Sequence, residues 1–440
     1  MNWLDSGVTP AQWNGIAISG NNAVACVNTA GGALYWSNDF GKTWHNSGVT
    51  GNSNWYGIAI SGTNAIACSS FPDINSAIWW SSDAGHTWTA SELGNKTWYS
   101  CSISGNKAVA CENNGSLWWS EDAGHTWSVA NATGSNNWTG VSVYTDNNGV
   151  YNAVACENNG SIWWSNDGKI WTDSGVANKR WNCIAISGTN ATAGVVNGNE
   201  VWWSSDAGHT WTIKAPVDKY WNSVSLSGMI GVATSANSYL WLSTDGGQTW
   251  KKDTSLGVKV WTGASVDSNN MVACVYNGSI WYTFQPVCLS SKVSVLMADK
   301  TYKSITNVKR GDKISSINDI ELNVVHAGYS IVNYNMLQST NLLFIIPKNM
   351  FGNGIPFKDV YISGHHRVII STYDKYIGIQ AFKFGDLRVL KHDEILDLTE
   401  LEEVRYYHIE VEGGKNIMIC DGLPLETLDI NEWTCNHIEN

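Results

Sequence analysis

One short motif recurs through the first two thirds of this chain and limits strongly how it can fold. The octapeptide SSDAGHTW occurs at 81–88 and again at 204–211, and SEDAGHTW occurs at 120–127. Looser copies are SNDFGKTW at 37–44, STDGGQTW at 243–250 and the shorter SNDGKIW at 165–171. In the copy at 81–88, the Asp83 carboxylate can accept hydrogen bonds from backbone N–H groups two residues on, and Gly85 can adopt a positive φ. The motif therefore predicts a tight turn between two strands, used six times.

A tryptophan recurs with the same period. Stretches such as WNGIAIS, WYGIAIS and WNCIAIS begin every 40 to 43 residues, at Trp13, Trp55, Trp98, Trp138, Trp181, Trp221 and Trp261. Repeats of this length, rich in short alternating strands, are typical of propeller blades with four strands each. The sequence therefore predicts an all-β N-terminal domain over residues 1–285, folded as a seven-bladed β-propeller.

The two ends of this region predict how the ring closes. The seventh repeat ends at SIWYT, residues 279–283, without a turn motif after it. The first residues, NWLDSGV at 2–8, match TWHNSGV at 43–49 and IWTDSGV at 170–176, which are outer-strand segments. We therefore expect the N-terminus to supply the outer strand of the last blade, so that no sheet edge stays open.

Composition changes near residue 285 and excludes several classes of protein. Of 26 Trp, 25 precede this point, whereas only one of the five Arg does, which indicates a second domain over residues 286–440. The net charge of −12, with no basic cluster, gives no electrostatic footprint for nucleic acid. The N-terminus has neither the basic start nor the apolar run of a signal peptide. No segment approaches the roughly 20 apolar residues that span a bilayer.

Cysteine and histidine follow the repeat. Five of the ten Cys occupy one repeat position, namely Cys26, Cys68, Cys111, Cys156 and Cys274. Equivalent positions of different blades are too far apart to form disulfides, so we expect small buried side chains, which favours a reducing, cytoplasmic compartment. His86, His125 and His209 lie in the turns without metal-ligand spacing around them. We expect them to be solvated, and we expect no metal or cofactor.

The S-x-D-x-G-x-T-W pattern resembles the Asp-box, or BNR, repeat of sialidases and sortilin-type receptors. The resemblance implies a structural role at the blade rim for Asp39, Asp83, Asp122, Asp167, Asp206 and Asp245. A sialidase is excluded, because that family holds its substrate carboxylate with a cluster of arginines and this region contains only Arg180.

Tandem tryptophans leave two interpretations open. The pairs are Trp79-Trp80, Trp118-Trp119, Trp163-Trp164 and Trp202-Trp203. They could stack on a sugar, or they could pack each blade against its two neighbours. Because adjacent residues of a strand face opposite ways, we favour packing.

Taken by itself, the last third predicts a small all-β domain with one Cys at its start. Three blocks in order resemble the Hint domain of inteins, hedgehog autoprocessing domains and bacterial Hint-type proteins: CLSSKVSVLMADKTYKSITNVKRGDKI at 288–314, PKNMFGNGIPFKDVYISGHHRVII at 347–370 and YYHIEVEGGKNIMICDGLPLET at 406–427.

The Hint resemblance implies self-cleavage at the bond between Val287 and Cys288. The Cys288 thiol would attack the Val287 carbonyl in an N-to-S acyl shift, since a thiol is a good nucleophile at neutral pH and leaves readily. His366 would protonate the departing amide nitrogen, and Ser363 would orient the scissile peptide. The closing block adds two further candidate catalytic residues, His408 and Asp421.

Departures from the family pattern keep two classes of function open. Gly364 stands in place of the usual Pro, Lys300 stands where Gly often follows the acidic residue, and the ending NHIEN makes protein splicing unexpected. The first class is a self-processing protein with single-turnover autocatalytic cleavage, which releases the propeller as a binding head. The second is a non-catalytic binding or structural protein with a degenerate Hint domain and a propeller that recognises a protein or a glycan.

Overall fold

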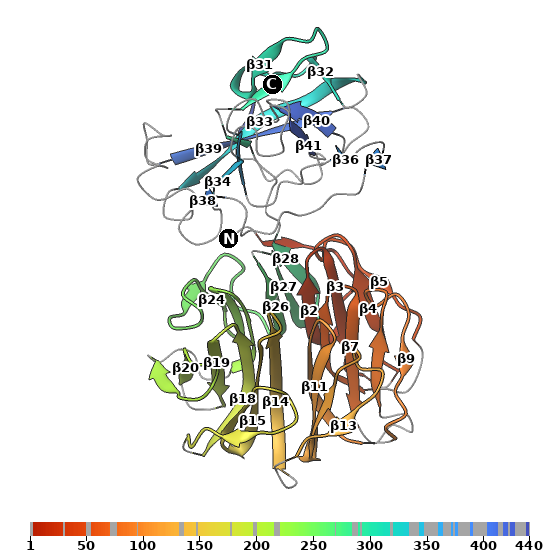
Figure 1. Cartoon of the computed structure of the whole chain (residues 1–440), viewed down its shortest axis with the longest axis vertical. Helices are drawn as coiled ribbons and strands as arrows, with labels where there is room; N and C mark the ends of the chain where they lie inside the picture. The colour runs from red at the N-terminus through yellow and green to blue at the C-terminus, as the bar shows by residue number, and fades with distance from the viewer. Residues whose placement is uncertain are drawn as a thin grey trace. The chain divides into compact units, whose positions relative to one another are not determined.

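The computed structural model of the chain divides into two compact units, Met1–Phe284 and Gln285–Asn440 (Figure 1). Across the described residues, no helix is both long enough and apolar enough to cross a membrane. The structure describes residues 3–29, 31–49, 54–70, 77–94, 96–131, 136–146, 148–176, 178–196, 200–214, 221–268, 270–283, 289–290, 293–316, 320–333, 343–346, 360–363, 371–372, 375–376, 388–389, 403–411, 417–420, 423–426 and 437–439.

The N-terminal unit is a succession of four-stranded antiparallel sheets whose strands pair in sequence order. The first sheet contains β2 (Ala11–Ser19), β3 (Asn22–Val27), β4 (Leu34–Ser37) and β5 (His45–Asn46). The second contains β6 (Asn54–Ser61), β7 (Asn64–Ser70), β8 (Ile78–Ser81) and β9 (Thr89–Ala90). The third contains β10 (Trp98–Ser104), β11 (Lys107–Gly115), β12 (Leu117–Ser120) and β13 (Ser128–Val129).

The same order continues through the next three sheets. The fourth contains β14 (Asn136–Thr145), β15 (Tyr151–Gly160), β16 (Ile162–Ser165) and β17 (Thr172–Asp173). The fifth contains β18 (Lys179–Ser187), β19 (Asn190–Val195), β20 (Val201–Ser204) and β21 (Thr212–Lys214). The sixth contains β22 (Trp221–Ser227), β23 (Ile230–Ser235), β24 (Leu240–Ser243) and β25 (Lys251–Asp253). In Figure 1 the long first strands lie toward the middle of this unit, and short fourth strands such as β9 and β13 lie outside.

The last sheet is completed by the N-terminal segment, as the sequence predicted. It contains β26 (Trp261–Asp267), β27 (Asn270–Gly278) and β28 (Ile280–Thr283), and β1 (Trp3–Asp5) pairs with β28 in antiparallel register. The Ser6 N–H extends the ladder to the carbonyl of Ile280 at 3.0 Å. The buried indole of Trp3 donates to a carboxylate oxygen of Asp253 at 2.9 Å. The first and last segments of this unit therefore share one sheet, and the unit is a closed β-propeller.

Hydrophobic clusters hold neighbouring blades together. Between the first two blades, buried Val24 and Leu34 of one pack with Trp55 of the other, and Trp79 lies against this cluster. Its neighbour Trp80 lies against the next cluster, between the second and third blades. The tandem tryptophans therefore pack toward both adjacent blades, as we favoured. Among the described residues, equivalent clusters occupy seven blade boundaries, the last between the seventh blade and the first.

Side-chain hydroxyls satisfy the strand edge that faces the centre of the ring. The Ser102 hydroxyl accepts the Val143 N–H of the next blade at 3.1 Å. In the same way, the Ser142 hydroxyl accepts the Ile186 N–H and the Ser225 hydroxyl accepts the Val266 N–H, both at 3.1 Å. Without these acceptors, the first strands of these blades would present unpaired N–H donors to the channel, so the inner-strand serines help to join neighbouring blades.

The repeated cysteines are buried inside this ring. All five that share the repeat position are fully buried and form no disulfide, as predicted. Burial raises the pKa of Cys156 to about 12 and that of Cys274 to about 11. These thiols are therefore protonated at neutral pH and pack as small apolar side chains.

The second unit consists of strands and one short 3₁₀ helix among the residues described. One sheet has the order β32 (Lys313–Ser315), β33 (Glu321–Asn333), β39 (Glu403–Val411), β29 (Leu289–Ser290), β35 (Val360–Ser363), β34 (Leu343–Ile346) and β38 (Arg388–Val389), with β42 (His437–Glu439) also on β33. A second has the order β31 (Tyr302–Ser304), β30 (Ser294–Leu296), β40 (Ile417–Cys420) and β41 (Leu423–Glu426). The strands β36 (Ser371–Thr372) and β37 (Lys375–Tyr376) form a hairpin, and η1 covers Ile305–Asn307.

Each turn of the repeated octapeptide rests on the preceding blade, which makes its glycine sensitive to substitution. Gly85 has a φ of 87°, and a Cβ there would lie 2.7 Å from Cγ1 of Val24. We expect Gly85→Ala to lower the free energy of unfolding by about 2–4 kcal/mol, because left-handed strain and this overlap add together. Chemical denaturation of the full chain measures the loss.

Gly62 is the matched control for this substitution. It has a φ of 63°, but an added Cβ meets no atom within 4 Å. Gly62→Ala should therefore add only the backbone strain, about 1–2 kcal/mol. Equal losses for the two variants would contradict the close packing of the turn against Val24.

Candidate functional site

The six Asp-box turns use their carboxylates inside the turn. In the turn at 81–88, the Asp83 carboxylate accepts the N–H of Thr87 at 2.9 Å and its hydroxyl at 2.6 Å. The Ser81 hydroxyl donates to Asp83 at 2.7 Å and accepts the Gly85 N–H at 2.9 Å. The Trp88 indole donates to the Gly85 carbonyl at 2.9 Å. The backbone N–H that donates to Asp83 thus lies four residues after it, in Thr87, and not two residues after it as the sequence predicted, because the loop between Asp and Thr is wider than a simple turn.

The other turns repeat this arrangement with one exception. Asp39, Asp122, Asp206 and Asp245 also accept the backbone N–H and the hydroxyl of the threonine four residues on. In the shorter copy, Asp167 accepts the N–H groups of Lys169 and Ile170 instead. The carboxylates thus accept hydrogen bonds from groups of their own turn, and their role is structural.

Hydrogen bonding sets the charge of these turns. Partial burial acts to raise the pKa of Asp83, but bonds from Thr87 and Ser81 outweigh it, so the pKa is lowered. The pKa is lowered for the same reasons at Asp122, Asp206 and Asp245, and by backbone and serine bonds at Asp167. The turns that contain these five aspartates are therefore anionic down to acidic pH.

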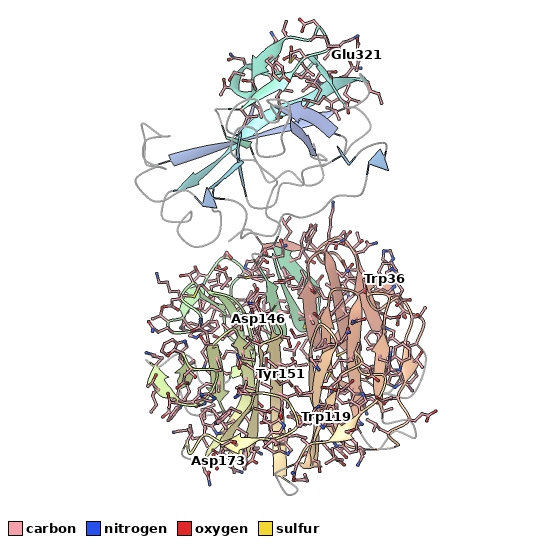
Figure 2. All side chains as sticks on the ribbon, viewed as in Figure 1. Trp36, Trp119, Asp146, Tyr151, Asp173 and Glu321 are labelled. Carbon is pink, nitrogen blue, oxygen red and sulfur yellow. The ribbon has the colours of Figure 1, made fainter. Side chains whose placement is uncertain are left out.

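The turn histidines contact tryptophans of the preceding blade, and His125 and His209 are nevertheless exposed, as expected, whereas His86 is half-buried. The His86 ring centroid lies 3.7 Å from that of Trp36, a tryptophan of the preceding blade that Figure 2 labels at the outer side of the propeller. His125 lies 3.8 Å from Trp80, and His209 lies 3.9 Å from Trp164. Each ring extends the contact between two blades, and within the described residues no cluster of three possible metal ligands includes it.

The centre of the propeller is a channel of about 500 Å³ lined by the first strand of every blade. Its lining contains amide, hydroxyl, thiol and aliphatic side chains and two tyrosines, Tyr56 and Tyr99. No Asp, Glu, Lys, Arg or His is among the lining residues that the structure describes. The volume lies within the range of about 300–1,000 Å³ that is usual for ligand pockets.

The second candidate site is the segment that opens the C-terminal unit. Val287, Cys288, His366 and Asp421 lie outside the described residues. Ser363 ends β35, and His408 lies within β39. Between these two strands runs β29, in which Leu289 pairs with Ile362 on one side and with Tyr407 on the other. The residue directly after Cys288 is thus joined to the immediate neighbours of Ser363 and His408.

The opening and closing blocks of this unit pair with each other, although more than 100 residues separate the paired strands. Ser290 pairs with Tyr406, and Val295 pairs with Cys420. In β33, Gly328 pairs with His408 on one side and with Ile438 on the other. Val295, Val411 and Cys420 are fully buried. This block pairing could not be predicted from the residues alone, because nothing in the sequence of either block indicates its partner strand.

Two aspartates shape the turns of the opening block. The Asp299 carboxylate accepts the N–H and the hydroxyl of Thr301 at 3.0 and 2.6 Å, and these bonds lower its pKa. Lys300, between them, has a φ of 67°. The Asp312 carboxylate accepts a hydrogen bond from Nζ of Lys303 at 2.6 Å. Partial burial acts to raise the pKa of Asp312, but this bond and the backbone N–H of Lys309 outweigh burial, so the pKa is lowered. The left-handed backbone at Lys300 explains physically why glycine is common there in the Hint pattern.

Comparison with protein families concerns the C-terminal part of the chain. A family model described as Hint domain matches residues 287–432, so this part is a Hint domain, as the three blocks predicted. No curated protein matches the chain.

Propellers are among the solved structures that are similar to the chain. A structure of YCF48 bound to D1 peptide has a TM-score of 0.50 at 15% identity, over 65% of this chain and 97% of that chain. YCF48 from Cyanidioschyzon merolae has a TM-score of 0.47 at 18% identity, over 64% and 98%. A GH74 xyloglucanase from Xanthomonas campestris has a TM-score of 0.48 at 13% identity, over 74% and 59%. At such identities the likeness concerns the fold alone.

The lowered pKa values of the Asp-box turns predict a loss of stability in acid. A carboxyl whose folded pKa lies below its unfolded value, near 3.9, stabilises the chain above that value and loses this effect as pH falls through the folded pKa. We therefore expect thermal unfolding midpoints to fall as pH is lowered below about 4. Asp83→Asn should make this fall shallower, and an unchanged slope would count against the charge of the turn.

The conformation of Lys300 predicts a stabilising substitution. Lys300→Gly should raise the free energy of unfolding by about 0.5–1 kcal/mol, because relief of left-handed strain exceeds the extra freedom of glycine in the unfolded chain. Lys300→Ala is the control, since it removes the same side chain and keeps the strain. Thermal unfolding compares the two variants. If the glycine variant is no more stable than the alanine variant, the backbone at residue 300 is not strained and the prediction is wrong.

Proposed function

We propose that this chain, a β-propeller followed by a Hint domain, is a self-processing protein. The Hint domain cleaves the peptide bond between Val287 and Cys288 and releases the propeller as a binding head. The match of residues 287–432 to the Hint family supports the reaction type. The observation that carries the proposal is the double pairing of Leu289 with Ile362 and Tyr407.

The proposal takes Cys288 to continue this ladder by one residue. In an antiparallel ladder, the residue before Leu289 corresponds to the residue after Ile362 and to the residue after Tyr407. Those residues are Ser363 and His408. In the proposal, one hydroxyl and one imidazole thus come from the two strands that flank the nucleophile, and His366 follows shortly after Ser363.

The proposed reaction has two steps. In the first, the Cys288 thiol loses its proton to water and Sγ adds to the carbonyl carbon of Val287. The C–N bond between the two residues then breaks as the amine of Cys288 takes a proton from protonated His366, which water protonates again. A thioester then joins Val287 to the Cys288 sulfur. In the second, water attacks this thioester, which gives a carboxylate on Val287 and restores the thiol. Ser363 orients the scissile peptide, and His408 and Asp421 assist from the closing block.

The cleavage is tested on the purified full chain with dithiothreitol, whose thiolate attacks the thioester faster than water does. Gel electrophoresis and intact mass should find fragments ending at Val287 and beginning at Cys288, because the thioester of the proposed reaction forms at that bond. Cys288→Ala should abolish both fragments, since it removes the nucleophile and leaves the fold. Ser363→Ala should slow their formation, because the scissile peptide loses its orienting hydroxyl.

The contrary result is equally clear. If the wild-type chain and Cys288→Ala stay intact to the same extent with dithiothreitol, hydroxylamine and water, the Hint domain is not catalytic. The chain is then a binding or structural protein, the second class of function left open by the sequence.

A further inference from the structure

A ring of hydrogen bonds runs around one mouth of the propeller channel. The residue that follows the first tryptophan of a blade donates its side chain to the tryptophan carbonyl of the next blade. Thr139 donates to the carbonyl of Trp181 at 2.9 Å, and Thr262 donates to that of Trp13 at 2.8 Å. Asn14, Asn182 and Asn222 make the equivalent bonds to the carbonyls of Trp55, Trp221 and Trp261.

Two adjacent blades lack this bond. In the second and third blades the equivalent residues are Tyr56 and Tyr99, and a phenol ring cannot make the short bond that asparagine or threonine makes. Their ring centroids lie 5.7 Å apart with planes at 43°. Tyr56 is 37% exposed, and both tyrosines line the channel. The break in the ring therefore coincides with an aromatic platform in which Tyr56 is exposed and Tyr99 is half-buried.

The surroundings of this platform are polar and uncharged. On either side lie Asn14 of the first blade and Thr139 of the fourth, and Asn182 and Asn222 continue the rim. Burial, with a contribution from Tyr56, raises the pKa of Tyr99, so its hydroxyl keeps its proton at neutral pH and can donate a hydrogen bond. No ionic side chain is among the described residues of the lining. A charged ligand would lose its hydration here without gaining a counter-ion.

We propose that the channel mouth at Tyr56 and Tyr99 binds a neutral saccharide chain. A sugar ring presents apolar C–H faces, which stack on the tyrosine rings, and hydroxyl edges, which exchange hydrogen bonds with amide and hydroxyl groups of the rim. This inference deepens the binding-head part of the proposed function and is independent of the cleavage reaction.

Binding is measured on the full-length Cys288→Ala chain, so that its outcome does not depend on processing. The probes for calorimetry are neutral hexasaccharides of β-1,4-linked glucose, xylose and mannose and of α-1,4-linked glucose, with hexaproline as a peptide that also stacks on aromatic rings. We expect at least one hexasaccharide to bind with a Kd of about 1 mM or lower.

The decisive variant is Tyr56→Thr with Tyr99→Thr, which removes the platform and restores the threonine found at 139 and 262. It should still fold, because two bonds of the ring become possible and offset part of the packing that Tyr99 loses against the neighbouring cluster, yet bind the sugar at least about tenfold more weakly. Tyr276→Ala is the control, because Tyr276 is 43% exposed and is not part of the channel lining. Its Kd should equal that of the parent.

Three outcomes would overturn the inference. They are the absence of binding by all four hexasaccharides, binding of hexaproline alone, and sugar binding that the double threonine variant leaves unchanged. None of them bears on the cleavage, which the gel assay reads separately.

Discussion

The pairing of β1 with β28 is the interaction on which the propeller depends. A row of four-stranded sheets packed side by side would expose the apolar face of its first and last members, and only a ring removes both. The chain closes that ring with its own first segment, which Trp3 holds by burying its indole and donating to Asp253. Serine hydroxyls then satisfy the donors that face the channel, as Ser102 does for Val143.

This mode of closure is compatible with release of the propeller. The last strand of the propeller, β28, ends at Thr283, before the proposed scissile bond. The strand that closes the ring, β1, comes from the N-terminal end of the propeller sequence. A cut after Val287 would therefore leave every strand of the ring in one fragment. In the C-terminal unit, the segment just after the cut is fixed by its own ladder, through Leu289 to β35 and β39. The strands of the propeller and the strands beside the proposed cleavage site thus belong to different sheets.

The repeat predicted the propeller, its closing strand and the packing of the tandem tryptophans, because one blade repeats the same environment at the same period. Features that depend on contact between different blades were not predictable in this way. Examples are the stacking of His86 on Trp36 and the break in the hydrogen-bond ring at Tyr56. The order of the Hint blocks could be recognised, but the pairing of Leu289 with Tyr407 could not, because many residues separate these strands.

Ring closure by the N-terminal strand is tested most directly by native-state hydrogen exchange of the full chain, read by mass spectrometry on peptic fragments. The Ser6 amide and the β1 amides that pair with β28 should exchange as slowly as those of β28, because they open only when the ring opens. Exchange of residues 3–6 at the rate of an unstructured peptide, with β28 still protected, would contradict closure and leave the last blade without its outer strand.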